Sequence, residues 1–69
     1  SVNGYRPGTH YRHYKGGQYV IVALANSCSG PVVVYRSDKG ECWLRPQEDF
    51  ESWVDVGGQR LRRFALEAG

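Results

Sequence analysis

Short runs of β-branched and aromatic residues alternate with glycine-containing turns along most of the chain. Such runs predict strands, because the side chains of a strand alternate between two faces and suit β-branched and aromatic residues. Glycines separate the runs at Gly16-Gly17, Gly30, Gly40 and Gly57-Gly58. The predicted strands are Thr9–Tyr14, Tyr19–Asn26, Pro31–Arg36, Glu41–Arg45, Val54–Val56 and Gln59–Phe64.

Three hairpin turns follow from the same pattern. Ser27–Gly30 and Ser37–Gly40 each end in glycine, which type I turns favour at their last position. The pair Gly57-Gly58 suits a tighter turn, whose central residues need positive φ angles.

The second of these turns also sets an expected register for the two cysteines. If Arg36 pairs with Glu41, then Tyr35 lies opposite Cys42, and Cys28 lies in the turn at the other end of the strand. At about 3.3 Å per residue the two cysteines are then on the order of 20 Å apart. A disulfide needs Cα atoms within about 7 Å, so we expect two free thiols, as in a reducing cytoplasm.

The pattern changes after the fourth predicted strand. Pro46 suits the first position of a helix, and Phe50, Trp53 and Val54 follow at helical spacing. We expect a short helix or 3-10 segment that closes one mouth of a barrel. The last apolar residues, Phe64–Leu66, fit either a strand or a terminal turn.

The chain has 69 residues, of which 41% are hydrophobic and 23% are charged. A chain of this length forms one domain with a thin core, and it is too short for a Rossmann fold or a TIM barrel. The pattern predicts a small all-β barrel or sandwich over residues 8–69, with a loose arm over residues 1–7. The longest apolar run, Val20–Ala25, is too short to cross a bilayer, so we expect no membrane partner.

Nine basic and seven acidic residues give a formal net charge of +2. No acid occurs before Asp38, and four acids fall between Glu48 and Asp55 with no base among them. The sequence pI of 8.7 is slightly below the value of about 9 typical of a dedicated nucleic-acid module, so the charge allows such a partner without requiring it. Two isolated cysteines and two upstream histidines lack the paired spacing of a zinc site, and we expect no metal or other cofactor.

Five pieces of the chain together resemble a known bacterial family. In order along the chain they are Gly8–Tyr19 with its Tyr-Arg-His-Tyr-Lys-Gly string, Val33-Val34-Tyr35, Trp43-Leu44-Arg45-Pro46, Phe50 and Arg63-Phe64. This series is similar to the family called domain of unknown function 1653. The resemblance implies a bacterial protein with an SH3-like barrel of five or six short antiparallel strands and one short helical or 3-10 insert. It implies no established reaction.

Two stretches depart from that family's pattern. Its members commonly carry an Ala-x-His-Ser stretch with acidic residues after the second strand, whereas this chain has Ala25-Asn26-Ser27-Cys28. The turn after Tyr35 is also shorter than in the family. If the family's function uses the loop over Asn26–Cys28, that function is altered here.

The segment His10–Lys15 is the first candidate for a binding surface. Alternate residues of a strand share a face, which groups Tyr11, His13 and Lys15 on one side. His13 and Lys15 would then donate hydrogen bonds to a ligand, and Tyr11 would stack on it. In the alternative, Tyr11 and Tyr14 pack a thin core, and His13 satisfies a backbone carbonyl near a turn.

A second candidate lies on the neighbouring strands. Trp43 and Arg45 are two residues apart and share a face, so Trp43 would offer a stacking platform and Arg45 a fork for a carboxylate or phosphate. Tyr35 would extend this surface. In the alternative, Trp43 belongs to the core, and Arg45 forms a salt bridge with one of the acids that follow it.

The densest basic cluster is Arg60, Arg62 and Arg63, which are candidates for phosphate contacts. The acidic run between Glu48 and Asp55 is an equally good partner for them, since surface pairing is common.

These residues predict a non-enzymatic module that binds an anionic or planar ligand, with nucleic acid as the leading class. Aromatic stacking and basic donors would act together, as they do on surfaces that bind single strands. The predicted ligand-binding residues are Tyr11, His13, Lys15, Tyr35, Trp43 and Arg45.

Two other functions stay open. A protein-interaction or self-association module would use an exposed edge strand, and a thin core would gain stability in a homodimer. An enzyme would use His13 and would need a nucleophile within hydrogen-bond reach. Cys28 with His13 is the only such pairing that the sequence offers, and no expected register brings the two together. We therefore expect no catalytic residues.

Overall fold

Within residues 3–67, seven antiparallel strands carry the fold, and a single turn of helix connects the fourth strand to the fifth. The computed structural model describes residues 3–67. The elements are η1 (Asn3–Tyr5), β1 (His10–His13), β2 (Gln18–Ser27), β3 (Gly30–Ser37), β4 (Cys42–Pro46), α1 (Gln47–Phe50), β5 (Trp53–Val56), β6 (Gln59–Arg62) and β7 (Phe64–Leu66). The predicted mainly β fold is confirmed.

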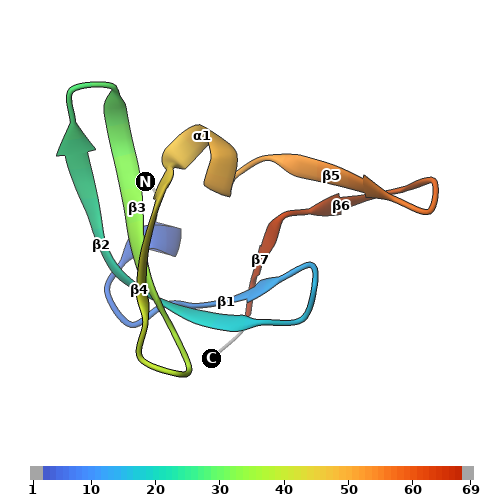
Figure 1. Ribbon diagram of the computed structural model, residues 1–69, viewed down its shortest axis with the longest axis horizontal. Helices are drawn as coiled ribbons and strands as arrows, with labels where there is room; N and C mark the ends of the chain where they lie inside the picture. The colour runs from blue at the N-terminus through green and yellow to red at the C-terminus, as the bar shows by residue number, and fades with distance from the viewer. Residues whose placement is uncertain (1–2, 68–69) are drawn as a thin grey trace.

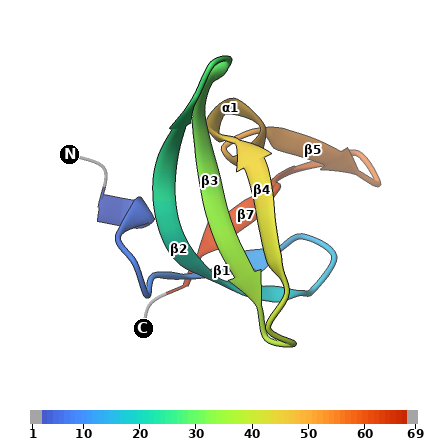
Figure 2. The ribbon, with the colours of Figure 1, turned by 60° about the vertical axis from the view of Figure 1, so that its left-hand side comes forward.

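Five strands form one antiparallel sheet in the order β4-β3-β2-β1-β7, whereas β5 and β6 form a separate hairpin. Strands β2, β3 and β4 run side by side, and β1 and β7 cross behind them, so that the sheet curls into an open, barrel-like form (Figures 1 and 2). A bulge between Ile21 and Ala23 interrupts the register of β2, and bulges bend a strand in this way. The β5–β6 hairpin extends away from the curled sheet (Figure 1).

The strand count differs from the predicted five or six. The segment predicted as one strand, Gln59–Phe64, is broken at Arg63 into β6 and β7. The break occurs because the N–H of Arg63 donates to the carbonyl of Ser52, while the carbonyl of Arg63 accepts from the N–H of Tyr14. Phe64–Leu66 therefore continues as a strand against β1, which decides between the two alternatives left open by the sequence.

Aromatic rings fill the inside of the curled sheet. The rings of Phe50 and Phe64 stack with their centroids 4.1 Å apart and an angle of 5° between their planes. Tyr35 packs edge-on against both of them. The buried residues of the core are Tyr5, Tyr11, Ile21, Val33, Tyr35, Phe50 and Phe64.

The sequence predicted a loose arm over residues 1–7, but part of this segment packs against the core. Tyr5 lies in the η1 turn and is only 7% exposed, because its ring packs against Tyr11 and Phe50. The following loop is held by the N–H of Gly8, which donates to the carbonyl of Ile21. Residues 1–2 of the predicted arm and residues 68–69 of the predicted domain lie outside the described residues.

The expected register between β3 and β4 is wrong by one residue. Arg36 pairs with Cys42, not Glu41, and Tyr35 therefore lies opposite Trp43. The N–H of Ser37 bonds the carbonyl of Glu41, so the loop holds three residues and not four. Gly40 ends that loop with a φ of 86°, the left-handed conformation that a three-residue hairpin loop needs at this place. The shift puts Trp43 on the inner face of the sheet beside Tyr35.

The expected helical face of Phe50, Trp53 and Val54 is also wrong. Helix α1 ends at Phe50, and Trp53 and Val54 begin β5. Ser52 ends the helix, since both its N–H and its hydroxyl donate to the carbonyl of Asp49. Trp53 then pairs with Arg62 of β6. The helix still closes one side of the sheet through Phe50, which is 2% exposed.

Candidate functional site

Strands β4 and β7 are the two edges of the five-stranded sheet, and Arg45 of β4 lies over the ring of Phe64 of β7. We call this surface the basic mouth. Each of its members has a basic or aromatic side chain that lies near the Phe64 ring or near His13. Its residues are His13, Lys15, Tyr35, Arg45, Arg63 and Phe64.

Arg45 crosses from β4 towards β7. Its Nε donates to the hydroxyl oxygen of Tyr35 at 3.2 Å, and its guanidinium carbon lies 5.6 Å from the centre of the Phe64 ring. The nearest carboxylate oxygen, on Asp49, is 3.9 Å from Nη1, and the Arg45 side chain keeps 31% of its surface exposed. The alternative interpretation of Arg45, a salt bridge with an acid that follows it, is thus found at Asp49. The hydrogen bond to Tyr35 and this ion pair hold the guanidinium, and part of it still faces solvent.

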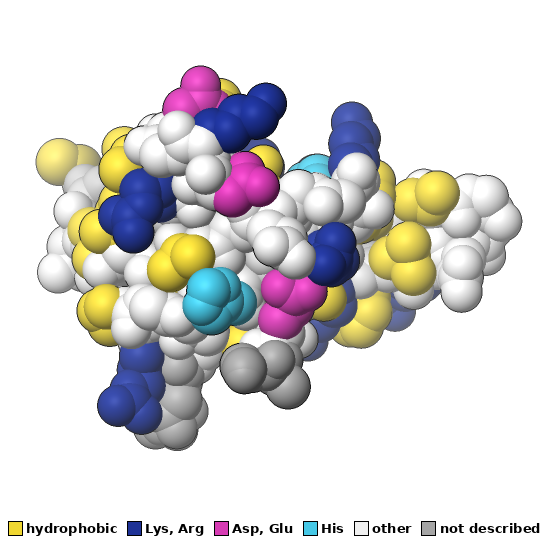
Figure 3. All heavy atoms as spheres, turned by 90° about the horizontal axis from the view of Figure 1, so that it is seen from below, with side chains coloured by type: hydrophobic (Ala, Val, Ile, Leu, Met, Phe, Trp, Pro, Cys, Tyr) yellow, Lys and Arg dark blue, Asp and Glu magenta, His cyan; other side chains and the backbone are white. Residues whose placement is uncertain are grey.

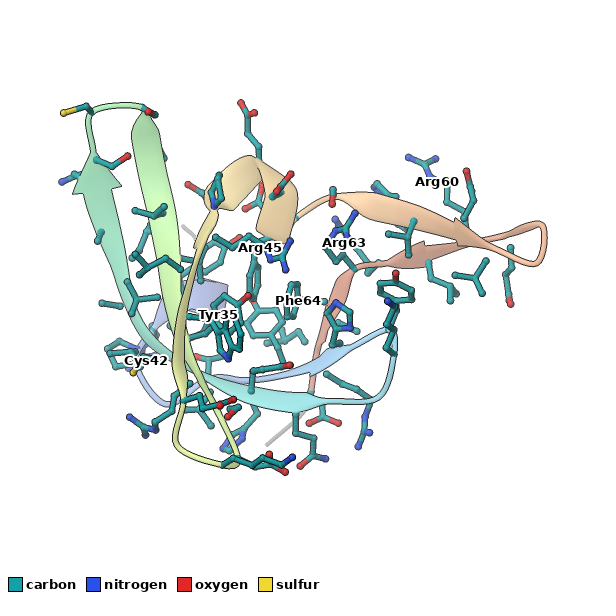
Figure 4. All side chains as sticks on the ribbon, in the orientation of Figure 1. Tyr35, Cys42, Arg45, Arg60, Arg63 and Phe64 are labelled. Carbon is teal, nitrogen blue, oxygen red and sulfur yellow. The ribbon has the colours of Figure 1, made fainter. Side chains whose placement is uncertain are left out.

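Arg63 reaches the same region from the break between β6 and β7. Its Nε donates to Ser52 Oγ at 2.8 Å, which anchors the guanidinium to the turn after α1. Figure 4 shows Arg45 and Arg63 coming from opposite sides towards the space beside Phe64. Among residues 3–67 no carboxylate forms a salt bridge with Arg63.

His13 lies close enough to both arginines to be affected by their charges. Its ring packs edge-on against Phe64, with 4.8 Å between ring centres, and its Nδ1 accepts the N–H of Lys15 at 3.2 Å. Burial lowers the pKa of His13, and the positive charges of Arg45, Arg63 and Lys15 lower it further. At neutral pH the ring is therefore uncharged, with Nε2–H as its donor. In the alternative interpretation, His13 donates to a backbone carbonyl, whereas in the structure its Nδ1 accepts a backbone N–H.

Trp43 is adjacent to the basic mouth but is not part of the core. It lies opposite Tyr35 on the inner face of the sheet, yet it remains 50% exposed because β4 is an edge strand. Together with Tyr19 and Lys39 it lines a recess of about 210 Å³. Trp43 therefore offers an exposed indole face within the curl of the sheet.

Tyr11 is separated from the other predicted residues. It is buried, with 9% of its surface exposed, as the alternative interpretation of this residue expects. Its ring stacks near that of Tyr5 and faces a second cavity, of about 480 Å³. This aromatic pocket is lined by Gly4, Tyr5, Tyr11, Phe50, Glu51, Arg62, Phe64, Ala65 and Leu66. The sequence pattern did not place Tyr5 and Glu51 together at a pocket, because it does not show that η1 and the end of α1 meet.

The other two candidate phosphate contacts lie on the projecting hairpin. Arg60 and Arg62 both stack on the ring of Trp53, with their guanidinium carbons 4.5 and 4.3 Å from its centre. In Figure 4 Arg60 lies well away from Arg45 and Arg63. The predicted cluster of three arginines is thus divided between two surfaces. Figure 3 shows hydrophobic side chains on this hairpin, at the right, and basic and acidic side chains mixed over the rest of that face.

Cys28 and Cys42 are both free and exposed. Within the part of the chain that the structure describes, no three His, Cys, Asp or Glu side chains are grouped so that they could hold a metal ion. None of the described helices is both long and apolar enough to span a bilayer.

The chain is thus a small domain with a curled antiparallel sheet, in which Arg45 and Arg63 are anchored near the two sheet edges. The model of the family described as "Protein of unknown function (DUF1653)" matches residues 9–66, and the chain therefore belongs to this family. A crystal structure of a DUF1653 protein from Bordetella bronchiseptica is 32% identical to this chain, with a TM-score of 0.76 over 94% of this chain and 90% of that one. The resemblance inferred from the five sequence pieces is thus confirmed. No curated protein matches the chain.

Proposed function

We propose that the protein is a non-enzymatic module that binds an anionic ligand with planar groups at the basic mouth, and that single-stranded nucleic acid is the leading class. The observation that carries the proposal is the convergence of Arg45 and Arg63 beside His13 and Phe64. Guanidinium groups bind phosphate in two-pronged geometry, and this geometry is most effective when other contacts hold the groups in place.

The anchoring contacts of the two arginines support this proposal. Each uses its Nε internally, on Tyr35 and on Ser52. Nη1 of Arg45 lies 3.9 Å from the exposed Asp49 carboxylate, which leaves Nη2 of Arg45 and the terminal nitrogens of Arg63 to face a ligand. Lys15 adds a third cation at the rim and is exposed. An ordered guanidinium loses little side-chain entropy when it binds, so this arrangement favours anion binding over a merely solvated surface.

Trp43 supports the planar part of the proposal. Its ring is half exposed and lies next to the mouth, on the same face of the sheet as Tyr35. Exposed aromatic rings beside basic groups stack on the bases of single strands without strong sequence preference. The module would act in a bacterial cytoplasm, where two exposed thiols such as Cys28 and Cys42 stay reduced.

The non-enzymatic part of the proposal follows from what lies near His13. The described neighbours of its ring are aromatic or basic, namely Tyr14, Tyr19, Phe64 and the three cations. A general base would instead need a nucleophile or a substrate-positioning acid within reach. Cys28 lies in the β2–β3 turn, at the far end of the long hairpin (Figure 1).

Fluorescence anisotropy with a labelled single-stranded oligonucleotide tests the proposal. If two to three phosphates are contacted, the slope of log K against log salt is about −1.4 to −2.1, and affinity falls about 7- to 20-fold between 50 and 200 mM salt. Arg45→Gln and Arg63→Gln should each weaken binding and make the slope shallower. Arg36→Gln is the matched control, since Arg36 is exposed on the outer face of β3 and carries the same charge. Equal losses for Arg36→Gln and Arg45→Gln would contradict a site at the mouth.

A second candidate function is self-association through an edge strand. Strand β4 is paired on one side only, and Leu44 on its outer face is 68% exposed. Edge strands of this kind accept a second strand. Sedimentation at increasing protein concentration separates the two functions, because an apolar dimer contact responds little to salt, whereas phosphate binding weakens steeply.

A further inference from the structure

The aromatic pocket on the η1 side of the sheet has the size and composition of a small-molecule site. Its volume of about 480 Å³ lies within the range of about 300–1,000 Å³ typical of ligand pockets. The rings of Tyr5, Tyr11, Phe50 and Phe64 supply its apolar walls. The planes of Tyr5 and Tyr11 are within 19° of each other, and both rings contact Phe50 edge-on.

Three polar groups face this pocket. The carboxylate of Glu51 accepts hydrogen bonds from the Tyr5 hydroxyl and from Gln47, both on Oε2, which leaves Oε1 with no donor among residues 3–67. The hydroxyl of Tyr11 likewise forms no hydrogen bond within the described chain. Arg62 holds the carbonyl of Glu51 through Nη1 and keeps other donors for the cavity. One acceptor and two donors thus converge on aromatic walls.

Gly4 is adapted to this arrangement. A Cβ atom at position 4 would collide with the Tyr11 hydroxyl, so glycine is what allows that hydroxyl to occupy its place at the pocket.

The charge state of the acceptor, the Glu51 carboxylate, is also fixed, because hydrogen bonds from Tyr5 and Gln47 lower the pKa of Glu51. At neutral pH the pocket therefore offers an ionised carboxylate, which accepts N–H groups and repels lone pairs.

We propose that the aromatic pocket binds a planar heterocycle that presents a ring N–H next to a carbonyl oxygen, the edge shared by uracil, thymine, hypoxanthine and guanine. Glu51 accepts the ring N–H, and Tyr11 or Arg62 donates to the neighbouring carbonyl. Cytosine and adenine present a ring nitrogen lone pair at the same position, which faces the carboxylate unfavourably. The base could belong to a nucleic acid or to a free nucleoside, and only the first source rests on the proposed function.

Two pairs of nucleosides test this inference, because the members of each pair differ only along the edge in question. Amide NMR titrations with uridine and cytidine, and with inosine and adenosine, give the affinities. For a nucleoside of this size we expect a dissociation constant on the order of 0.1–1 mM for uridine and inosine. The preference over cytidine and adenosine should be about tenfold or more. Equal affinity within each pair, or no shifts at residues of the pocket, would overturn the inference.

Conservative variants then assign the polar contacts. Tyr11→Phe removes only the hydroxyl and should weaken uridine binding about 2- to 10-fold, the usual value of one neutral hydrogen bond. Tyr14→Phe is the matched control, since Tyr14 lies outside the pocket, and it should bind like the parent protein. Glu51→Gln should reduce the preference for uridine over cytidine, because an amide both donates and accepts. An unchanged preference in Glu51→Gln would contradict the assigned role of the carboxylate.

The two proposals fail in different ways. Nucleosides carry no phosphate, so Arg45→Gln should leave uridine binding unchanged while it weakens oligonucleotide binding. Binding of uridine without binding of any oligonucleotide would refute the proposed function and support the pocket, with a free nucleoside as the source of the base. Salt-sensitive oligonucleotide binding without discrimination among nucleosides would support the basic mouth and refute the pocket.

Discussion

Phe64 is the residue at which the core and the basic mouth meet, and its replacement by alanine tests whether the fold is organised around it. The side chain is 4% exposed and stacks on Phe50 at 4.1 Å. The ring also contacts His13, Tyr19 and Tyr35 at centroid distances of 4.8, 5.8 and 5.3 Å. Removing it takes away the partner of four aromatic contacts at once.

The size of the effect can be compared with the stability of the whole domain. Burying a phenylalanine of this kind contributes about 3–5 kcal/mol, as judged by Phe→Ala substitutions in other cores. A domain of 69 residues has a free energy of unfolding of about 3–10 kcal/mol, from about 0.05–0.15 kcal/mol per residue. Phe64→Ala should therefore remove a third or more of the stability. Phe64→Leu keeps most of the apolar surface but loses the aromatic geometry, and should cost about 1–2 kcal/mol.

Urea unfolding followed by far-UV circular dichroism measures these differences. Leu66→Ala is the control on the same strand, because Leu66 is 61% exposed and should change the free energy of unfolding by about 0.5 kcal/mol or less. The order Phe64→Ala, then Phe64→Leu, then Leu66→Ala should hold, from most to least destabilised. A loss below about 1 kcal/mol for Phe64→Ala, or an equal loss for Leu66→Ala, would refute this description of the core.

Further predictions follow from three local features. Gly40 has a φ of 86°, so Gly40→Ala should lower the free energy of unfolding by about 1–2 kcal/mol. Thermal or urea unfolding measures this change, and an unchanged midpoint would contradict the three-residue loop. The pKa of His13 is lowered in the folded protein, so stability should fall as the pH drops from the unfolded value near 6.5 through the lower folded value. NMR titration of the imidazole should also show a higher pKa for His13 in Arg45→Gln, and an unshifted pKa would place Arg45 away from the ring. Cys28 and Cys42 are exposed, so both should react with a thiol reagent in the native protein without denaturant. Protection of either cysteine would show that it is covered in solution.

The sequence pattern was sufficient to predict most of the strands and the family, because both depend on local chemistry. Glycine-containing turns and β-branched runs located the β2–β3 and β3–β4 hairpins close to their observed bounds. The error in the β3–β4 register has a local cause as well. Gly40 was interpreted as the last residue of a four-residue turn, whereas its positive φ ends a three-residue loop.

The parts that could not be predicted depend on contacts between distant segments. Tyr5 and Glu51 are 46 residues apart, yet the hydroxyl of one bonds the carboxylate of the other. Helical spacing suggested that Trp53 belongs with Phe50, but the capping contacts of Ser52 and pairing with β6 place it in a strand. The division of the arginine cluster likewise depends on the break at Arg63, which long-range backbone hydrogen bonds impose.

An amide NMR titration of the labelled protein with a short single-stranded oligonucleotide, at low and at physiological salt, tests the central claim most directly. The basic mouth predicts salt-sensitive shifts at His13–Lys15, at Trp43–Arg45 and at Arg63, with little change on the outer face around Arg36. An absence of shifts even at low salt, or shifts confined to the β5–β6 hairpin, would contradict it.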